Sequence, residues 1–423
     1  MPAYSSRFGC CPEILLDQNC RISYCHNSTS ATTENSEGLS VDVSFEIRGP
    51  PALSLCFVRC YDLTGRQRFS EEPKPSIIGV AGGLVLLDIP FWDGDGDINQ
   101  WSYTDYFVYR AGPGAPSLHL LPGPYPAICS MKVAILPIYD DVEHYAVVFP
   151  FVQFVVLDSS HHYTLYIYRS DCKAWCTRVA RIADDMETQN AMLKLALHYP
   201  TSVVHARPGL IGWVDLWWGV LLCNVLDESP TIRFVAVPVP EPCETLTEFF
   251  VKFEDQNRAK RPYRQMTVHN GVMKFIELEL HRGPACFNTK RRDDPGWTAT
   301  TWTRPISSDV WHKSLTFDTS DISVTDWSSL HLLLPEILDG KRKLTWEKFI
   351  SGAPTLSLHD DHIVYIVVKS VWHQTAFILA VNTRSLTLES CAQCSGEMIA
   401  SLEPTYVPSA LSSYFGMTTF VLP

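Results

Sequence analysis

The sequence lacks the segments that mark membrane or secreted proteins. An apolar run at residues 210–226 (LIGWVDLWWGVLLCNVL) has seventeen residues, whereas a membrane helix needs about 20. It also carries Asp215 near its middle, where a carboxylate would cost several kcal/mol in a bilayer. The N-terminus has no basic segment followed by an apolar core, so it does not have the pattern of a secretory signal. We expect a cytoplasmic or nuclear protein, neither secreted nor transmembrane, with reduced cysteines.

Positive charge is also scarce. The chain has 46 acidic and 34 basic residues and a formal net charge of −12, which disfavours binding to nucleic acid and to anionic membranes. Three short basic clusters occur at residues 258–264, 290–292 and 341–343. We interpret them as solvated loops, with docking or nuclear-import signals as the alternative.

Sequence motifs of catalysis and phosphate binding are missing. The chain contains no G-x-S-x-G, no G-x-x-x-x-G-K-[ST] and no H-E-x-x-H. An acidic loop holds Asp93, Asp95 and Asp97, but it has Ile98 where an EF-hand has glycine and Thr104 where it has glutamate. We interpret this segment as a solvated loop, with a weak cation site as the alternative. We predict no catalytic residue and no cofactor.

The cysteines are scattered and do not have the regular spacing of a disulfide or zinc-binding framework. Cys10, Cys11, Cys20 and Cys25, followed by His26, supply enough ligands for zinc. Their spacing lacks the paired short knuckles of a zinc module. Buried or incidental thiols are the interpretation that we favour, and metal binding at these four cysteines stays an open alternative.

Apolar runs recur along the chain, each just after a turn-forming cluster such as Gly82-Gly83, Pro208-Gly209, Asn270-Gly271 or Asp360-Asp361. Such runs begin near residues 82, 145, 210, 271 and 362, at intervals of about 61 to 91 residues, and most are followed by two further strand-like segments. Hydrophobic residues make up 46% of the chain and aromatic residues 12%, which suits a β-rich core. Repeated strand groups are typical of a radial β architecture.

We therefore predict a mainly β, propeller-like fold of about six blades of antiparallel strands with a few helical insertions. Residues 1–40 are expected to be an irregular segment, and residues 41–423 a single propeller-like domain. A helical insertion is expected near residues 326–350, and two other helical segments at 184–197 and 241–253.

The run at residues 210–226 is better explained by two strands than by a helix. Gly212 and Gly219 would each cost about 1 kcal/mol inside a helix. A strand, a tight turn at Trp218 and Gly219, and a second strand fit the other runs, with both strands covered on each face. Asp215 in so apolar a strand must be hydrogen-bonded or must point into the channel.

Several aromatic residues fall in or beside predicted loops. Trp101, Tyr103, Trp297 and Trp302 are our candidate interaction residues, and Trp311 has a similar setting. Aromatic rings on a loop face often anchor a protein partner, because they bury a large area at small entropic cost. The alternative, which is the simpler one, is that these rings fill gaps between blades.

Several segments in order resemble a plant family, abundant in grasses, known as domain of unknown function 1618. They are VDVSFEIRGPPALSLCFVRC, GLVLLDI, GLIGWVDLWWGVLLCNVL and SLHDDHIVYIVVK. The resemblance implies no catalytic residue, substrate or cofactor. A weaker resemblance, at residues 83–87, 106–109 and 118–122, is to the kelch-like propellers that follow F-box domains, although no F-box is expected here.

These observations predict a non-catalytic protein-interaction module in which loops from several blades contact a protein partner. An enzyme with its site in the propeller channel is the first alternative, and a nucleic-acid-associated regulator using the basic loops is the second.

Overall fold

The computed structural model describes most of the chain with several gaps. The described residues are 12–61, 68–69, 73–92, 103–112, 114–126, 131–139, 143–155, 160–189, 191, 194–195, 198–239, 263–281, 295–324, 346, 349–370, 376–394 and 405–415. The chain divides into two compact units, where the sequence predicted a single domain over 41–423. The first comprises residues 1–125, 141–143 and 406–423, and the second comprises residues 126–140 and 144–405.

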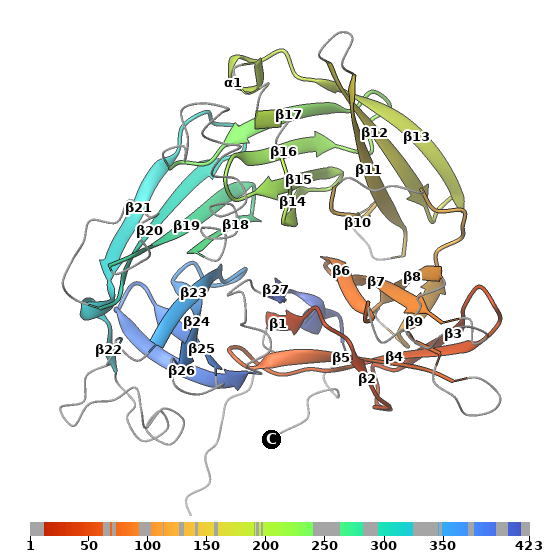
Figure 1. Cartoon of the computed structure of the whole chain (residues 1–423), viewed down its shortest axis with the longest axis horizontal. Helices are drawn as coiled ribbons and strands as arrows, with labels where there is room; N and C mark the ends of the chain where they lie inside the picture. The colour runs from red at the N-terminus through yellow and green to blue at the C-terminus, as the bar shows by residue number, and fades with distance from the viewer. Residues whose placement is uncertain are drawn as a thin grey trace, which may run out of the picture. The chain divides into compact units, whose positions relative to one another are not determined.

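The first unit contains a four-stranded antiparallel sheet (Figure 1). Its strands follow one another along the chain as a meander, and the predicted turn at Gly82 and Gly83 joins the first two. The strands are β6 (Ser76–Ala81), β7 (Leu84–Phe91), β8 (Tyr103–Arg110) and β9 (Ser117–Leu120).

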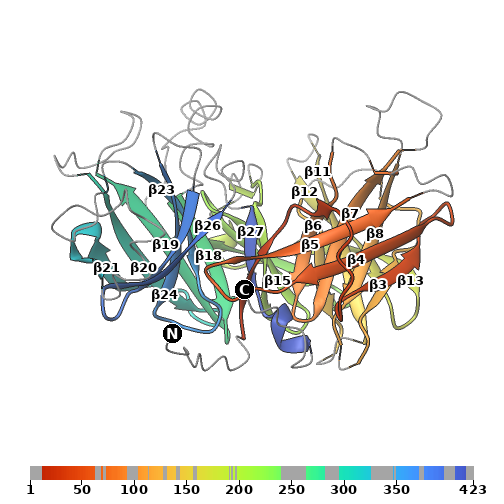
Figure 2. The same ribbon diagram turned by 90° about the horizontal axis from the view of Figure 1, so that it is seen from below.

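The second sheet of this unit draws strands from both ends of the chain. Its order is β27-β1-β5-β4-β3, and β2 pairs with β5. Figure 2 shows β3, β4 and β5 side by side. Three of its strands lie within residues 1–40, which the sequence predicted to be irregular. Pairing with the long apolar β5 and with β4 overrides the weak local strand preference there. The strands are β1 (Ile14–Asp17), β2 (Arg21–Ile22), β3 (Ala31–Glu34), β4 (Ser40–Glu46), β5 (Leu53–Cys60) and β27 (Tyr406–Ser409).

The second unit opens with an eight-stranded sheet made of two four-strand meanders. A short parallel pairing of β13 with β17 joins the meanders. The first meander is β10 (Ala134–Pro137), β11 (Tyr145–Val155), β12 (Ser160–Arg169) and β13 (Ala174–Ile182). The second is β14 (Ser202–Arg207), β15 (Leu210–Asp215), β16 (Gly219–Asn224) and β17 (Thr231–Ala236).

The apolar run at residues 210–226 is the hairpin of β15 and β16, so the strand–turn–strand prediction is confirmed. Every residue of β15 is buried, as both-face coverage predicts. Gly219 has φ of +152°, and a Cβ built there would lie 2.1 Å from the carbonyl oxygen of Val235 on β17. Glycine is therefore required for β16 to leave the turn this close to its neighbour.

Two further sheets complete the described part of the second unit. One is a four-stranded antiparallel meander, and in the other β22 adds to a four-strand meander in parallel with β26. The first consists of β18 (Arg264–His269), β19 (Val272–Leu280), β20 (Trp297–Pro305) and β21 (His312–Asp318). The second consists of β22 (Ser323–Val324), β23 (Phe349–Leu356), β24 (Ile363–Ser370), β25 (Ala376–Asn382) and β26 (Thr387–Cys394). Short 3-10 turns follow β21 (Thr319–Asp321) and β27 (Leu411–Tyr414).

Helix is rare in the described residues. The segment predicted at 184–197 contains α1 (Met186–Gln189), a single turn. The segment predicted at 241–253 lies outside the described residues, as does most of the insertion predicted near 326–350, of which Phe349 and Ile350 begin β23. No helix in the described ranges has the length and apolar character to cross a bilayer.

The mainly β, propeller-like fold class is confirmed. The meanders β6–β9, β10–β13, β14–β17, β18–β21 and β23–β26, with the sheet built from both chain ends, give six strand groups among the described residues. Each meander is the blade unit expected of such a protein.

Candidate interaction site

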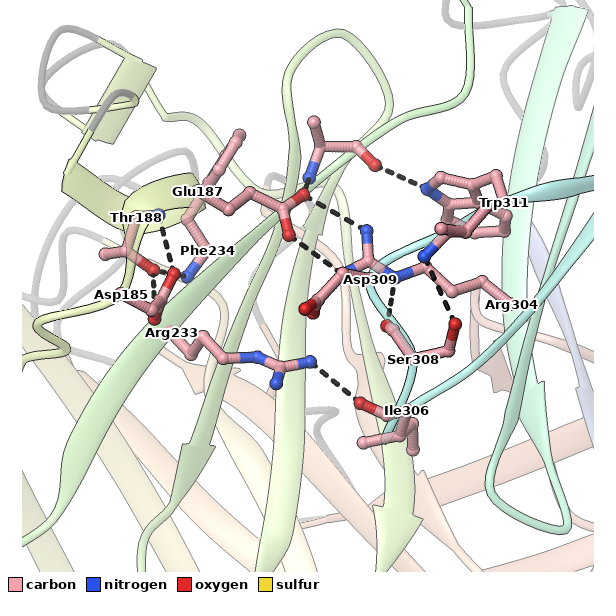
Figure 3. Close-up of polar contacts among 12 residues, drawn as sticks. Asp185, Glu187, Thr188, Arg233, Phe234, Arg304, Ile306, Ser308, Asp309 and Trp311 are labelled. Carbon is pink, nitrogen blue, oxygen red and sulfur yellow. Dashed lines mark hydrogen bonds and ion pairs between the residues drawn. The ribbon is translucent and has the colours of Figure 1, made fainter.

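Two segments of the second unit, distant in sequence, are fastened to β17 by a polar network (Figure 3). One is the segment around α1, and the other is the connection between β20 and β21. Glu187 in α1 and Arg304 near the end of β20 form its central ion pair. The network therefore joins the eight-stranded sheet to the β18–β21 sheet within one unit.

Arg304 is buried and its hydrogen-bonding groups are directed at fixed acceptors. Its Nη1 and Nη2 donate to the two carboxylate oxygens of Glu187 at 3.1 and 2.8 Å, and its Nε donates to the carbonyl of Ser308 at 2.7 Å. This fork-to-fork arrangement is the strongest form of arginine–carboxylate pairing. Asp309 lies 3.5 Å from the same guanidinium but its side chain is 84% exposed, so it contributes little.

The backbone of one β17 residue, Ala236, is hydrogen-bonded to both segments. The amide of Ala236 donates to Oε1 of Glu187 at 2.9 Å. The carbonyl of Ala236 accepts from Nε1 of Trp311 at 2.8 Å. Glu187 and Trp311 thus hold their segments against the same strand residue, as Figure 3 shows.

A second layer of contacts fixes the conformation of each segment. Asp185 accepts from the amide and the hydroxyl of Thr188 at 2.8 and 2.9 Å, while the Thr188 hydroxyl accepts from the amide of Phe234 at 2.9 Å. Arg233 Nη2 donates to the carbonyl of Ile306 at 2.8 Å. The short α1 turn, too short to be stable alone, is therefore held by side-chain and strand contacts.

Each fastened segment presents one large apolar side chain to solvent. Met186, next to Glu187, is 76% exposed, and Val310, next to Asp309, is 56% exposed. The Glu187–Arg304 ion pair holds together the two segments that carry these side chains, and we call the two exposed side chains the Met186–Val310 surface. Contacts carried on rigid backbone lose little conformational entropy on binding, so this surface is the candidate interaction site. Sequence reasoning missed it, because a methionine in a presumed helix and a valine in a loop carry no signal by themselves.

Asp215 is hydrogen-bonded to backbone amides. It is 1% exposed, and its two carboxylate oxygens accept from the amides of Trp217 and Tyr199, each at 2.8 Å. The first contact closes the turn after β15, and the second attaches the chain that precedes β14. Asp215 therefore holds the hairpin turn in place.

The candidate aromatic residues that the structure describes, Tyr103, Trp297 and Trp302, all lie in strands. Trp297 begins β20 and is 1% exposed, and its ring packs edge-on against Phe317 and Trp346. Its place is in the core, because alternate residues of β20 face inward. Tyr103 begins β8, where its hydroxyl accepts from Asn35 and its ring stacks on Phe91.

Trp302 is in β20, and both Trp302 and Trp311 are partly buried against Phe275. These contacts are those expected of gap filling, the simpler alternative, and an interaction role for Trp302 stays a prediction. Trp101 lies outside the described residues.

The candidate cysteine group is only partly described. Cys20 is buried in the core of the first unit and Cys25 accepts a weak hydrogen bond from Asn27, while Cys10 and Cys11 lie outside the described residues. Within the described ranges, no three histidine, cysteine or acidic side chains are grouped to hold a metal ion.

Arg264, the last residue of the basic cluster at 258–264, is buried in a strand, whereas the sequence predicted that this cluster is a solvated loop. It is 4% exposed in β18, pairs with Glu277 at 2.7 Å and donates to the carbonyl of Leu216. The rest of that cluster, apart from Tyr263, and the clusters at 290–292 and 341–343 lie outside the described residues.

Asp88 on β7 is a titratable residue that the sequence did not single out. Burial raises the pKa of its carboxyl to about 6. No hydrogen-bond donor among the described residues offsets this burial, which is why the protonated form is favoured.

Several solved structures match most of this chain, with low TM-scores and very different sequences. The β-propeller domain of Cps50 (Swd1) from Myceliophteria thermophila is 7% identical, with a TM-score of 0.32 and coverage of 87% of this chain and 88% of that one. A periplasmic gluconolactonase from Pseudomonas aeruginosa is 12% identical, with a TM-score of 0.33 and coverage of 84% and 83%. The WD40 domain of SCAP from fission yeast is 7% identical, with a TM-score of 0.32 and coverage of 90% and 85%.

A search of curated proteins gave no match. The model of one protein family does match part of the chain, and that part includes the β15–β16 hairpin from Trp213 onward together with β17–β23 and the start of β24. Residues 213–365 match the family described as "Protein of unknown function (DUF1618)", which confirms over this region the family resemblance seen in the sequence.

Proposed function

We propose that this protein is a non-catalytic protein-interaction module and that the Met186–Val310 surface contacts its partner. The observation that carries the proposal is the combination of two exposed apolar side chains with a rigid polar network behind them. Exposed apolar side chains add binding energy when a partner covers them. The network of Glu187 and Arg304 keeps the two segments in place before the partner arrives.

The chemistry of the network supports a scaffold role. Arg304 donates to an acceptor through all three of its nitrogens, and Glu187 accepts from Arg304 and from the backbone of β17. The Arg304 guanidinium and the Glu187 carboxylate are thus engaged in holding the two segments together. We infer that their role is to position the Met186–Val310 surface.

Site-specific photo-crosslinking tests this proposal. A benzophenone amino acid is placed at position 186, and at position 179 in the control, because Val179 on β13 is also an exposed apolar residue, at 58%. Each protein is irradiated in a lysate of the organism that makes it, and crosslinked proteins are identified by mass spectrometry. We expect the same partner to crosslink reproducibly from position 186 and not from position 179. Absence of any reproducible partner at 186, or the same set at both positions, would overturn the proposal.

A further inference from the structure

The first unit carries an exposed stack of side chains centred on an arginine. The Arg59 guanidinium carbon lies 4.5 Å from the ring centroid of Tyr24 and 5.2 Å from that of Tyr61. The ring of His26 is stacked with that of Tyr24, with centroids 6.1 Å apart and planes within 10°. Tyr24 and Tyr61 are 59% and 40% exposed. We call these four residues the Arg59 stack.

Strand geometry builds the stack. Arg59 and Tyr61 alternate with the buried residues Val58 and Cys60 at the end of β5, so both side chains leave the same face of the sheet. Tyr24 follows β2, which runs parallel to β5 and pairs at Phe57 and Val58. The two tyrosines are thereby placed next to the guanidinium.

The guanidinium has no acceptor among the described residues. Asp42 is its cross-strand partner on β4, yet the Asp42 carboxylate accepts from the Thr32 hydroxyl at 2.6 Å and forms no ion pair with Arg59. Aromatic contacts hold an arginine without using its N–H groups. Within the described part of the chain, the donors along its edge are therefore not occupied by an acceptor.

We propose that the Arg59 stack is a docking site for an acidic peptide segment of a protein partner. A carboxylate fits the planar fork of a guanidinium through two parallel hydrogen bonds. It carries one negative charge, which one arginine balances, whereas a phosphate ester carries nearly two. Tyrosine and arginine are the residues most enriched at binding hot spots, and the exposed rings of Tyr24 and Tyr61 can cover apolar groups beside the carboxylate.

This inference extends the proposed function to a second surface and rests on the proposal that the chain binds proteins. Its test does not use the Met186–Val310 surface, so the two can fail separately. The probe is a fluorescein-labelled peptide of glutamate, glycine and one tryptophan, and its binding to the full-length protein is measured by fluorescence anisotropy. Two comparison peptides replace glutamate by glutamine or by phosphoserine.

The variants distinguish an effect of the Arg59 stack on binding from an effect of the protein's net charge. Arg59→Gln should weaken binding of the glutamate peptide at least about tenfold, because the charge-assisted hydrogen bonds are lost. Arg59→Lys should also weaken it, since lysine keeps the charge but not the planar fork. Arg48→Gln is the matched control: Arg48 follows β4, is 46% exposed and pairs with Glu46, and its removal changes the net charge equally.

The expected result is binding of the glutamate peptide that depends on Arg59, is unchanged by Arg48→Gln within about twofold, and is lost with the glutamine peptide. Thermal unfolding checks that Arg59→Gln remains folded, and Tyr24→Ala serves as a second variant of the stack. Failure of the native protein to bind the glutamate peptide would overturn the inference. Equal weakening by Arg48→Gln, or tighter binding of the phosphoserine peptide, would also overturn it.

Discussion

Arg304 and Arg59 are arginines in two regions of the molecule, and they differ in burial and in the partners of the guanidinium. Arg304 is buried, and its nitrogens donate to Glu187 and to the backbone at Ser308. Arg59 is partly exposed, with tyrosine rings beside its guanidinium and no acceptor at its edge among the described residues. The first region joins parts of the protein to one another, and the second presents a charge to the outside.

The difference follows from the cost of burying charge. An ion removed from water must recover several kcal/mol through partners, so a buried arginine requires a complete set of acceptors. An arginine near water has no such requirement, and contact with aromatic rings is enough to orient it. The comparison predicts that substitutions in the first region change stability, whereas substitutions in the second change binding.

The largest expected effect is that of Arg304→Ala. The substitution removes the ion pair and leaves the Glu187 carboxylate without its main partner, so we expect a loss of about 3 kcal/mol. Native-state hydrogen exchange of the β17 and β20 amides measures it, because it reports on this unit alone. A loss below about 1 kcal/mol, as for exposed pairs, would show that the network is not what joins the segments.

Asp88→Asn sharpens the comparison with a partly buried carboxyl group that no hydrogen-bond donor among the described residues stabilises in its charged form. The folded-state pKa of the Asp88 carboxyl, about 6, is above its ordinary value of 3.8. Folding therefore favours the protonated form, and stability falls as the pH rises from about 4 through about 6. Asparagine cannot ionise, so Asp88→Asn should stabilise the protein by about 2 kcal/mol at pH 8.

The pH dependence is the control for this substitution. The stabilisation should be small at about pH 4, where the carboxyl of Asp88 is protonated in the folded protein. Urea denaturation of both proteins at the two pH values measures the difference. An equal effect at both values would mean that the change acts through packing and not through charge.

Trp311→Phe tests a single bond of the network. The substitution removes the hydrogen bond from Trp311 Nε1 to the Ala236 carbonyl and leaves an aromatic ring against Phe275, so a loss of about 1 kcal/mol is expected. Trp302→Phe is the control, because Trp302 also packs on Phe275 and its indole nitrogen has no acceptor among the described residues. Comparable losses in denaturant titrations of the two variants would argue against the bond.

Arg59→Lys should have the smallest effect on stability. Exposed cation–π contacts contribute about 0.5 to 1 kcal/mol, and lysine retains part of that attraction to Tyr24 and Tyr61. We expect the melting temperature of this variant to match that of the native protein closely. A clear drop would place Arg59 among the residues that hold the fold and would remove the contrast with Arg304.

The sequence predicted the strand groups because their signals are local. Turn residues at 82–83, 208–209, 270–271 and 360–361 all separate strands in the structure, since glycine and aspartate favour turns wherever they occur. The β15–β16 hairpin follows from the same reasoning. The strands within residues 12–40 could not be predicted locally, because β1 and β2 are stabilised by partners on β5 and β27.

The candidate site was not predictable for a related reason. Glu187 and Arg304 are 117 residues apart, and neither belongs to a motif, so only the folded chain shows that they meet. Trp297 illustrates the opposite error. Its position beside a presumed loop suggested exposure, whereas the inward side of β20 places its ring in the core.

Calorimetric titration of the crosslinked partner tests the central claim most directly, that a rigid network presents the Met186–Val310 surface for binding. The double variant Met186→Glu and Val310→Glu is compared with Val179→Glu, and the melting temperature of each is measured alongside. The account predicts at least about tenfold weaker binding by the double variant, with an unchanged melting temperature and normal binding by Val179→Glu. Equal affinity in the two variants, or weaker binding accompanied by unfolding, would contradict it.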